Sequence, residues 1–196
     1  SNPPFYKWYE DGVTNTCYNA LDIHIDNGKG KQTALIYDSP ITGNKSKFSY
    51  EELKLKVSKF AGGLKDQGVL KGDRVIIYMP MIPEAVIAML ACARIGAIHS
   101  VVFGGFASNE LASRIDDSKA KLLVTASCGF EPGRIVEYKP LVDEAVKQAK
   151  HKISKMILFQ RPGHEVKLNV PNEVSWEEVV TNAKEIDCVE MNSNEF

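Results

Sequence analysis

Residues 74–106 read RVIIYMPMIPEAVIAMLACARIGAIHSVVFGGF, and this stretch holds two apolar runs separated by a helical pattern. The first run, Arg74 to Met79, is rich in β-branched residues and predicts a strand. Pro83 suits the first position of a helix, and Gly96 suits its C-terminal cap. The second run, Ala97 to Phe103, predicts another strand. A strand, a helix and a strand in this order are typical of two parallel strands joined by a right-handed crossover.

The same alternation continues on both sides of this stretch. Upstream, the sequence predicts a hairpin made by Thr33 to Tyr37 and a short run near Lys47 to Ser49, then a helix that begins with the capping box of Ser49 and Glu52. Downstream, it predicts a helix capped by Ser108, a strand from Lys121 to Ala126, a helix after Pro140, a strand from Met156 to Phe159, and a short helix with a capping box of Ser175 and Glu178. The strands are apolar along their length, as expected when both sheet faces are covered. We therefore predict an α/β fold, with a parallel sheet and helices on both faces.

The length of 196 residues suits one large domain. Residues 1–30 show no regular pattern but carry several aromatic side chains, so we interpret them as an N-terminal arm packed on the body. A disordered terminus is the alternative interpretation. Residues 31–196 form the predicted α/β portion.

The composition argues against several classes of protein. Hydrophobic residues make up 44% and charged residues 25% of the chain, as in an ordinary globular protein. The net charge is −1 and the lysines are mixed with acidic residues, which argues against a nucleic-acid partner. No segment reaches the ~20 apolar residues of a membrane-spanning helix, so no membrane partner is expected.

The cysteines and histidines indicate no metal centre. The four cysteines form no CxxC motif and the four histidines form no HExxH motif. His99 lies in a predicted strand, where a core histidine is the expected role. This cysteine pattern favours a reducing, intracellular compartment, which is the cytoplasm, or the mitochondrial matrix if a targeting peptide has been removed.

Ligands of parallel α/β sheets bind outside the carboxyl ends of the strands, so a site is expected in the loops at those ends. Phe103-Gly104-Gly105-Phe106 follows the second strand and leads into the helix at Ser108. Paired glycines let a ligand approach the backbone, and a helix N-terminus attracts phosphate. A tight turn whose glycines serve packing is the alternative.

The loop after the third strand, Ser127 to Arg134, also contains two glycines. Arg134 is expected at the mouth of the next helix, where its guanidinium could bind a phosphate through two hydrogen bonds. A surface salt bridge is the alternative role for this side chain. Two such loops on adjacent strand ends favour one shared phosphate ligand. The usual phosphate, dinucleotide and nucleophile-elbow motifs are absent from the sequence.

These loops lie within a longer pattern. The stretch from Tyr78 to Phe106 resembles acetyl- and propionyl-CoA synthetases of the adenylate-forming superfamily. Four shorter runs support the resemblance: CYNALDIHI at 17–25, KGDRV at 71–75, RIDDSKAK at 114–121 and GFEPGR at 129–134. IYDSPITG at 36–43 and EPGRIVEYKPLVDEA at 131–145 are most similar to the propionyl-CoA branch.

The resemblance implies the N-terminal part of an ATP-dependent ligase that joins propionate or acetate to CoA through an acyl-adenylate. It implies that the nucleotide end of CoA is held by Phe103, Gly104, Gly105, Glu131, Pro132, Gly133 and Arg134. The sequence departs from the family at Glu131, where an arginine is frequent, and at Ile23, where an arginine is common in the corresponding motif. Only Arg134 is then left to supply positive charge from the second loop.

The resemblance also implies that the chemistry lies outside this segment. The ATP loop, the carboxylate pocket, the magnesium-binding acid and the C-terminal lid are expected further along the chain. We therefore expect no catalytic residue here, an inactive segment, and ATP and Mg²⁺ bound by the other part. A non-catalytic fragment that binds CoA or a partner protein is the alternative function, and a structural piece without a ligand is a third. Acetate and propionate are both left open as substrates.

Overall fold

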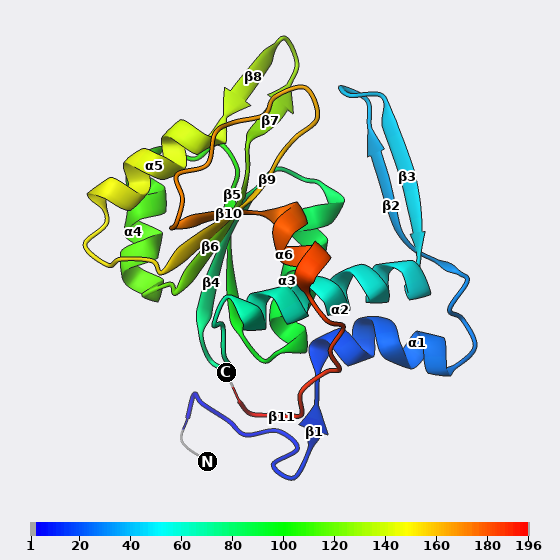
Figure 1. Cartoon of the computed structure of the whole chain (residues 1–196). Helices are drawn as coiled ribbons and strands as arrows, with labels where there is room; N and C mark the ends of the chain where they lie inside the picture. Colours follow the sequence, from blue (N-terminus) through cyan, green and yellow to red (C-terminus); the bar gives the residue numbers. More distant parts are fainter. Residues whose placement is uncertain (1–2, 196) are drawn as a thin grey trace.

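The computed structural model describes residues 3–195 and has a five-stranded sheet at its centre (Figure 1). All neighbouring strands in this sheet pair in parallel, in the order β10–β9–β6–β4–β5. Its strands are β4 (Arg74–Met79), β5 (Ile98–Phe103), β6 (Leu122–Ala126), β9 (Lys155–Phe159) and β10 (Glu173–Ser175). The predicted parallel sheet is confirmed, and β10 is a strand that the sequence reasoning missed.

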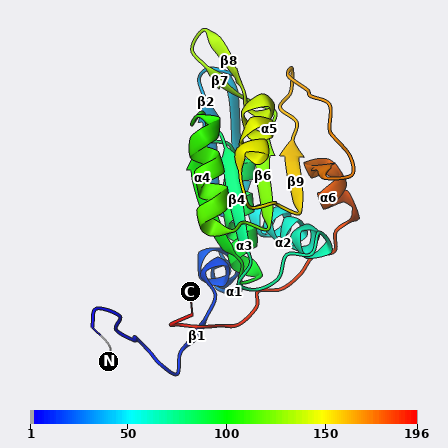
Figure 2. The ribbon, with the colours of Figure 1, turned by 90° about the vertical axis from the view of Figure 1, so that its left-hand side faces the viewer.

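Helices cover both faces of the sheet, which confirms the predicted architecture (Figure 2). The helices are α2 (Tyr50–Asp66), α3 (Pro83–Arg94), α4 (Ser108–Ser118), α5 (Tyr138–Gln148) and α6 (Trp176–Asn182). Helices α4 and α5 pack together on one face, and α2 packs with α3 and α6 on the other. Strands β4 and β6 are therefore buried between two layers, whereas β5 forms an edge of the sheet. The expected core position of His99 was wrong, because this residue lies on the edge strand β5 and is exposed.

Local sequence signals explain where the helices begin. Ser49 and Glu52 form the predicted capping box. The Ser49 N–H donates to Glu52 Oε2 at 2.8 Å, and the Glu52 N–H donates to Ser49 Oγ at 3.2 Å. At α6, the side chain of Ser175 accepts a hydrogen bond from the Glu178 N–H, but the reciprocal bond of a capping box is absent from this pair. The predicted cap of α4 was wrong, because Ser108 is its first helical residue.

Two hairpins flank the carboxyl edge of the sheet. The first pairs β2 (Thr33–Ser39) with β3 (Asn44–Ser49) and confirms the prediction. The second pairs β7 (Cys128–Glu131) with β8 (Arg134–Glu137), where the sequence predicted a loop. Pro132 and Gly133 form its turn, and the φ of +76° at Gly133 suits the second central position of a type II turn. Arg134 therefore begins a strand and does not lie at the mouth of α5.

The two ends of the chain meet below the amino edge of the sheet. Strand β1 (Val13–Thr14) pairs with β11 (Met191–Asn192), and a π-helical turn, η1 (Tyr18–Asp22), leads into α1 (Ile23–Asp26). The side chains of Cys17 and Leu21 belong to the hydrophobic core.

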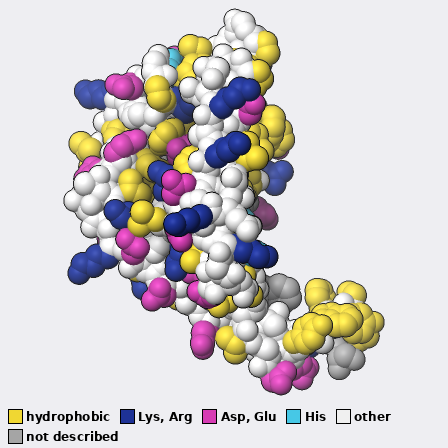
Figure 3. Space-filling view, turned by 90° about the vertical axis from the view of Figure 1, so that its right-hand side faces the viewer, with side chains coloured by type: hydrophobic (Ala, Val, Ile, Leu, Met, Phe, Trp, Pro, Cys, Tyr) yellow, Lys and Arg dark blue, Asp and Glu magenta, His cyan; other side chains and the backbone are white. Residues whose placement is uncertain are grey.

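The aromatic side chains nearer the N-terminus are exposed, and Figure 3 shows the hydrophobic side chains that gather on this part of the chain. Elsewhere on the face seen in Figure 3, basic and acidic side chains are interspersed. Within residues 3–195, no helix has both the length and the apolar character that crossing a membrane requires.

Candidate ligand-binding cleft at the carboxyl edge of the sheet

A cleft of about 330 Å³ lies at the carboxyl ends of β4 and β5 and beside the β7–β8 hairpin. Strands β4 and β6 are neighbours, but the helices that come after them in the chain cover opposite faces of the sheet. Helix α3 follows β4 and covers one face, and α5 precedes β9 and covers the other. Such a switch point is where parallel sheets leave a crevice for ligands. A second hollow of about 470 Å³ adjoins the first, and both are lined by Tyr37, Ile82, Phe130 and Arg161. The β2–β3 hairpin supplies part of the wall of both hollows.

The loop after β5 borders this cleft. Phe103 and Gly104 line it, and Phe103 is 66% exposed. A Cβ at Gly104 would collide with the Tyr138 hydroxyl and come within 2.9 Å of the Met79 carbonyl oxygen. A glycine is therefore required at residue 104 for packing, whatever ligand binds beside it.

The second glycine of this loop has a different role. Gly105 has a φ of +105°, a left-handed conformation that glycine adopts without strain. Its N–H donates to the Tyr78 hydroxyl at 3.1 Å, and that hydroxyl donates to the Phe106 carbonyl at 2.8 Å. The Gly105 N–H is thus already engaged. Helix α4 begins at Ser108 with no capping side chain, so no side chain occupies the first N–H groups of the helix.

The second predicted loop approaches the same cleft, but only in part. Glu131 lines the cleft, whereas Pro132 and Gly133 form the tip of the hairpin. The Arg134 side chain is 71% exposed and pairs with Glu131 across the turn, with its Nε and Nη2 atoms 2.7 and 2.6 Å from Glu131 Oε2. In this state the side chain of Arg134 makes the surface salt bridge that the sequence left open as an alternative.

Tyr138 connects the two loops. It is the first residue of α5, and its buried hydroxyl lies against both Gly104 and Gly129. A Cβ added at Gly129 would lie 2.6 Å from this hydroxyl oxygen. The pKa of Tyr138 is raised to about 12, mainly by burial and to a smaller degree by the neighbouring Tyr78. Burial also raises the pKa of Tyr78. Both hydroxyls are therefore protonated at neutral pH, and their part in the cleft is to hold the two loops in place.

Arg161 is a cleft residue that the sequence reasoning missed. It follows β9 by two residues, is 6% exposed, and its guanidinium stacks over Phe130 at 4.7 Å from the ring centroid. Its backbone N–H donates to Ser127 Oγ at 2.9 Å, but its guanidinium has no hydrogen-bond acceptor or ion-pair partner among residues 3–195. The signal was available, because the same rule that selected the other strand-end loops also applies to the loop after β9.

Arg161 is the cation that lines the cleft, and the two carboxylates that also line it, Asp38 and Glu131, are paired with Lys45 and Arg134. Glu84, in the first turn of α3, lines the adjoining hollow, and burial raises the pKa of its carboxyl despite the nearby Arg161. No ion pair joins Glu84 to Arg161, so the guanidinium is available to a ligand. Charge-assisted hydrogen bonds to an unpaired guanidinium are among the stronger polar contacts in proteins. The cleft is therefore suited to binding a phosphate-bearing ligand.

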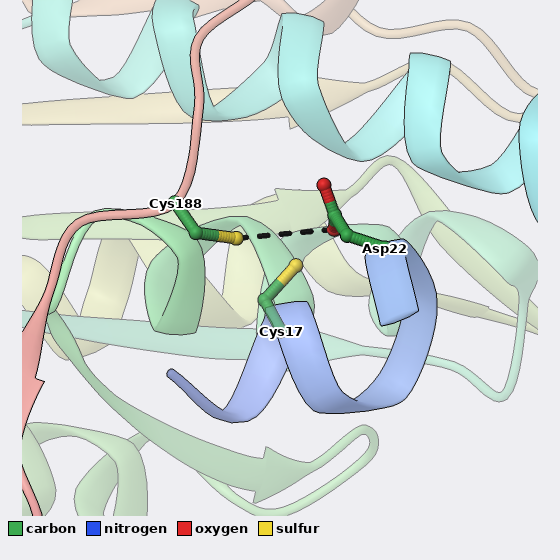
Figure 4. A group of neighbouring side chains, drawn as sticks. All are labelled: Cys17, Asp22 and Cys188. Atoms are coloured by element: carbon green, nitrogen blue, oxygen red, sulfur yellow. Dashed lines mark hydrogen bonds between the residues drawn. The ribbon is translucent and has the colours of Figure 1, made fainter. Parts of the chain in front are cut away.

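A second cluster of polar side chains lies far from the cleft. Cys17, Asp22 and Cys188 place one ligand atom each within 4.8 Å of the others (Figure 4). Arg94 donates to both Asp22 oxygens, at 2.8 and 3.0 Å. A guanidinium in this position occupies the carboxylate and repels a cation, so the cluster does not fit a metal ion.

Comparisons with known proteins agree with the fold. The family model described as AMP-binding enzyme matches residues 24–192. The chain is 55% identical over 188 residues to acyl-CoA synthetase short-chain family member 3, mitochondrial, of Rattus norvegicus, which covers 95% of this chain and 28% of that protein. It is 48% identical over 179 residues to acetyl-coenzyme A synthetase of Streptomyces avermitilis, covering 91% of this chain and 27% of that protein.

A solved structure has a similar fold. The crystal structure of Brucella canis acyl-CoA synthetase matches with a TM-score of 0.76 and 21% sequence identity, over 97% of this chain and 32% of that one. The chain thus spans less than a third of the length of these similar proteins.

Proposed function

Because the chain belongs to the family of AMP-binding enzymes, we propose that it is the N-terminal part of an ATP-dependent short-chain acyl-CoA ligase. The whole protein would convert propionate or acetate, ATP and CoA into an acyl-CoA, AMP and pyrophosphate. The observation that carries the proposal is the 55% identity, along 95% of the chain, to a protein described as a short-chain acyl-CoA synthetase. The runs at 36–43 and 131–145 favour propionate.

In this proposal the segment supplies CoA contacts but no catalytic group. Residues 31–196 are the first part of the large N-terminal domain, and residues 1–30 are its arm. ATP, its Mg²⁺ and the carboxylate bind to the part of the protein outside this segment. The compartment is intracellular, either cytoplasm or mitochondrial matrix, and the similarity to the mitochondrial protein of Rattus norvegicus favours the matrix.

The proposed CoA-nucleotide site combines Phe103, Gly104 and Gly105 with residues 131–134. Support comes from the cleft, to which both loops contribute. The exposed ring of Phe103 offers a surface on which an adenine can stack. To bind a phosphate, Arg134 must release Glu131. This release costs little free energy, because an exposed ion pair contributes only about 0–1 kcal/mol.

Arg161 adds a cation to this proposed site. Its guanidinium breaks no ion pair when it binds a phosphate, and Phe130 already holds it against the cleft. Hydrogen bonds to charged groups contribute about 1.5–3 kcal/mol each. We therefore expect Arg161 to contribute more to phosphate binding than Arg134 does.

Calorimetric titration with CoA and with dephospho-CoA tests this assignment. Arg161→Met should weaken CoA binding by roughly 10- to 100-fold, which is the range that one such bond implies. Arg134→Ala should weaken it by a few-fold and reduce the preference for CoA over dephospho-CoA. Arg114→Ala, at an exposed arginine on α4, is the matched control and should bind CoA as the wild type does. Unchanged binding in both cleft variants would contradict the site.

An activity assay distinguishes the ligase from the alternative function, a non-catalytic protein that binds CoA or a partner. Pyrophosphate release that depends on propionate or acetate, measured with the full-length protein, supports the ligase. CoA binding without any release of pyrophosphate supports the alternative.

A further inference from the structure

Two cysteines from opposite ends of the sequence meet at the amino edge of the sheet. Cys17 directly precedes η1, and Cys188 lies in the irregular segment between α6 and β11. Their sulfur atoms lie within 4.8 Å of each other, beside the Asp22 carboxylate (Figure 4). Cys17 is fully buried, whereas Cys188 is half-buried, so a small molecule would have to pass Cys188 to reach the sulfur of Cys17.

The surroundings of the pair favour a thiolate at Cys17. Arg94 is fully buried and places its Nη1 atom 3.5 Å from Cys17 Sγ. The Cys188 thiol donates to Asp22 Oδ2 at 3.9 Å. The nearby Cys188, and to a lesser degree Arg94, hold the pKa of the Cys17 thiol below its ordinary value despite burial. The pKa of Cys188 is raised, chiefly by the neighbouring Cys17 and then by burial. Cys17 is thus the more acidic thiol of the pair and the better nucleophile.

Other charged groups around the pair are already matched. Asp22 accepts two bonds from Arg94 and lies 3.3 Å from Lys54 of α2, so its charge is balanced within the cluster. A structural role as ordinary buried thiols does not account for this setting. Cys92 shows that ordinary state: it is buried in the core, and burial raises its pKa to about 12.

We propose that Cys17 and Cys188 are a modification site for peroxides, at which the two thiols close to a disulfide. The Cys17 thiolate attacks one peroxide oxygen, the O–O bond breaks, and hydroxide leaves, which gives a sulfenic acid at Cys17. The sulfur of Cys188 then attacks the sulfur of Cys17 as its proton is lost, the S–S bond forms, and the hydroxyl of the sulfenic acid leaves as water. Two thiols are oxidised by two electrons in total, and one peroxide is reduced to two waters.

The structure allows the sulfurs to approach each other. A disulfide requires an S–S distance of about 2.05 Å, so the two atoms must move closer than they now lie. Cys188 can supply this movement because residues 183–190 form no helix or strand. Its neighbour Val189 is tied to the same region by bonds of 2.9 Å to the Arg94 carbonyl and 2.8 Å from the Asn15 side chain. These ties keep Cys188 beside Cys17 while its own side chain moves.

A disulfide at this position would have a measurable consequence. It would join residues 17 and 188 and so enclose nearly the whole described chain in one loop. Long loops closed by a disulfide restrict the unfolded state strongly. The oxidised protein should therefore unfold at a higher temperature than the reduced protein, and a thiol reductant should reverse the difference.

Peptide mapping of the wild-type protein tests the proposal directly. The protein is treated with hydrogen peroxide, free thiols are alkylated, and the digest is analysed without reductant. A cross-linked peptide pair that contains Cys17 and Cys188 is the expected product. Sulfinic or sulfonic acid at Cys17, no oxidation, or cross-links that involve Cys92 or Cys128 would overturn the proposal.

Variants provide the matched comparison. Cys17→Ser and Cys188→Ser should abolish both the cross-link and the rise in unfolding temperature after peroxide, whereas Cys92→Ser should keep both. The wild-type peptide map decides the question even if a variant fails to fold. The outcome is independent of CoA binding, so it also stands apart from the test of the proposed ligase.

Discussion

Two buried arginines lie at opposite edges of the same sheet and differ in their polar contacts. Arg94, at the amino edge, is completely enclosed and donates to both oxygens of Asp22 and to the Ile186 carbonyl at 2.7 Å. Arg161, at the carboxyl edge, is almost as buried, but its guanidinium has no acceptor among residues 3–195. The first arginine therefore holds chain segments together, and the second faces a cleft that a ligand can fill.

The difference extends to the regions around the two side chains. At the amino edge, Asn15 donates to the carbonyls of Ala93, Arg94 and Val189, so the two chain ends are bonded to the end of α3. At the carboxyl edge, the walls come from loops and hairpins that leave open hollows. Buried polar groups lower the stability of a fold unless they are satisfied, so an unsatisfied buried cation points to a binding site.

The largest expected effect concerns stability at these two arginines. Arg94→Met should lower the free energy of unfolding by about 3–5 kcal/mol, because it leaves the buried Asp22 carboxylate without its main partner. Arg161→Met should change it by about 1 kcal/mol or less, because only the stacking on Phe130 is lost. Urea denaturation of both variants measures the difference.

The two variants serve as controls for each other, since each replaces a buried arginine by the same side chain. Similar losses of stability would show that Arg161 has a structural partner, and the contrast between the two edges would fail. A large loss at Arg161 alone would assign the structural role to the carboxyl edge.

Local signals in the sequence predicted most of the fold. The capping box at Ser49, the proline at Pro83 and the apolar runs at 74–79 and 122–126 act within one element, so they identify it without knowledge of the rest. The β7–β8 hairpin was missed although its Pro132-Gly133 turn was visible, because its strands are only four residues long. The three residues of β10 carry too short a pattern to predict a strand.

The sites were less predictable, for a physical reason. The cleft position of Phe103, Gly104 and Glu131 follows from the rule that strand ends meet at one edge. The pairing of Arg134 with Glu131 depends on a turn that was not recognised. The cluster of Cys17 and Cys188 depends on contacts between the two ends of the chain, and no local pattern encodes them.

The next largest effect is a pH dependence at the amino edge. Burial alone would raise the pKa of Asp22, but hydrogen bonds from Arg94 and then Lys54 outweigh it and hold the pKa below its ordinary value. A carboxylate with a lowered pKa in the folded state stabilises the fold above its unfolded pKa of about 3.9. That contribution is lost as the pH falls through the folded pKa. The wild type should therefore exceed Asp22→Asn in stability at neutral pH, and the gap should narrow below about pH 4.

Thermal unfolding from pH 7 down to pH 2 in steps measures this gap. Asp117→Asn, at an exposed carboxylate near the end of α4, is the control and should differ from the wild type by the same small amount at every pH. A gap between wild type and Asp22→Asn that is constant over the whole range would show that the carboxylate charge is not what stabilises the amino edge.

The smallest expected effect on stability is at the hairpin tip of the carboxyl edge. Glu131→Gln removes the charge that holds Arg134. Because the side chains of Arg134 and Glu131 are 71% and 43% exposed, the free energy of unfolding should change by less than about 1 kcal/mol. The freed guanidinium should bind phosphate more readily, so CoA affinity should rise by a few-fold, whereas Arg134→Ala should lower it. In the double variant, the gain from Glu131→Gln should disappear, since it acts through Arg134. A gain that persists without Arg134 would mean that Glu131 repels the phosphate directly and that the gain does not act through Arg134.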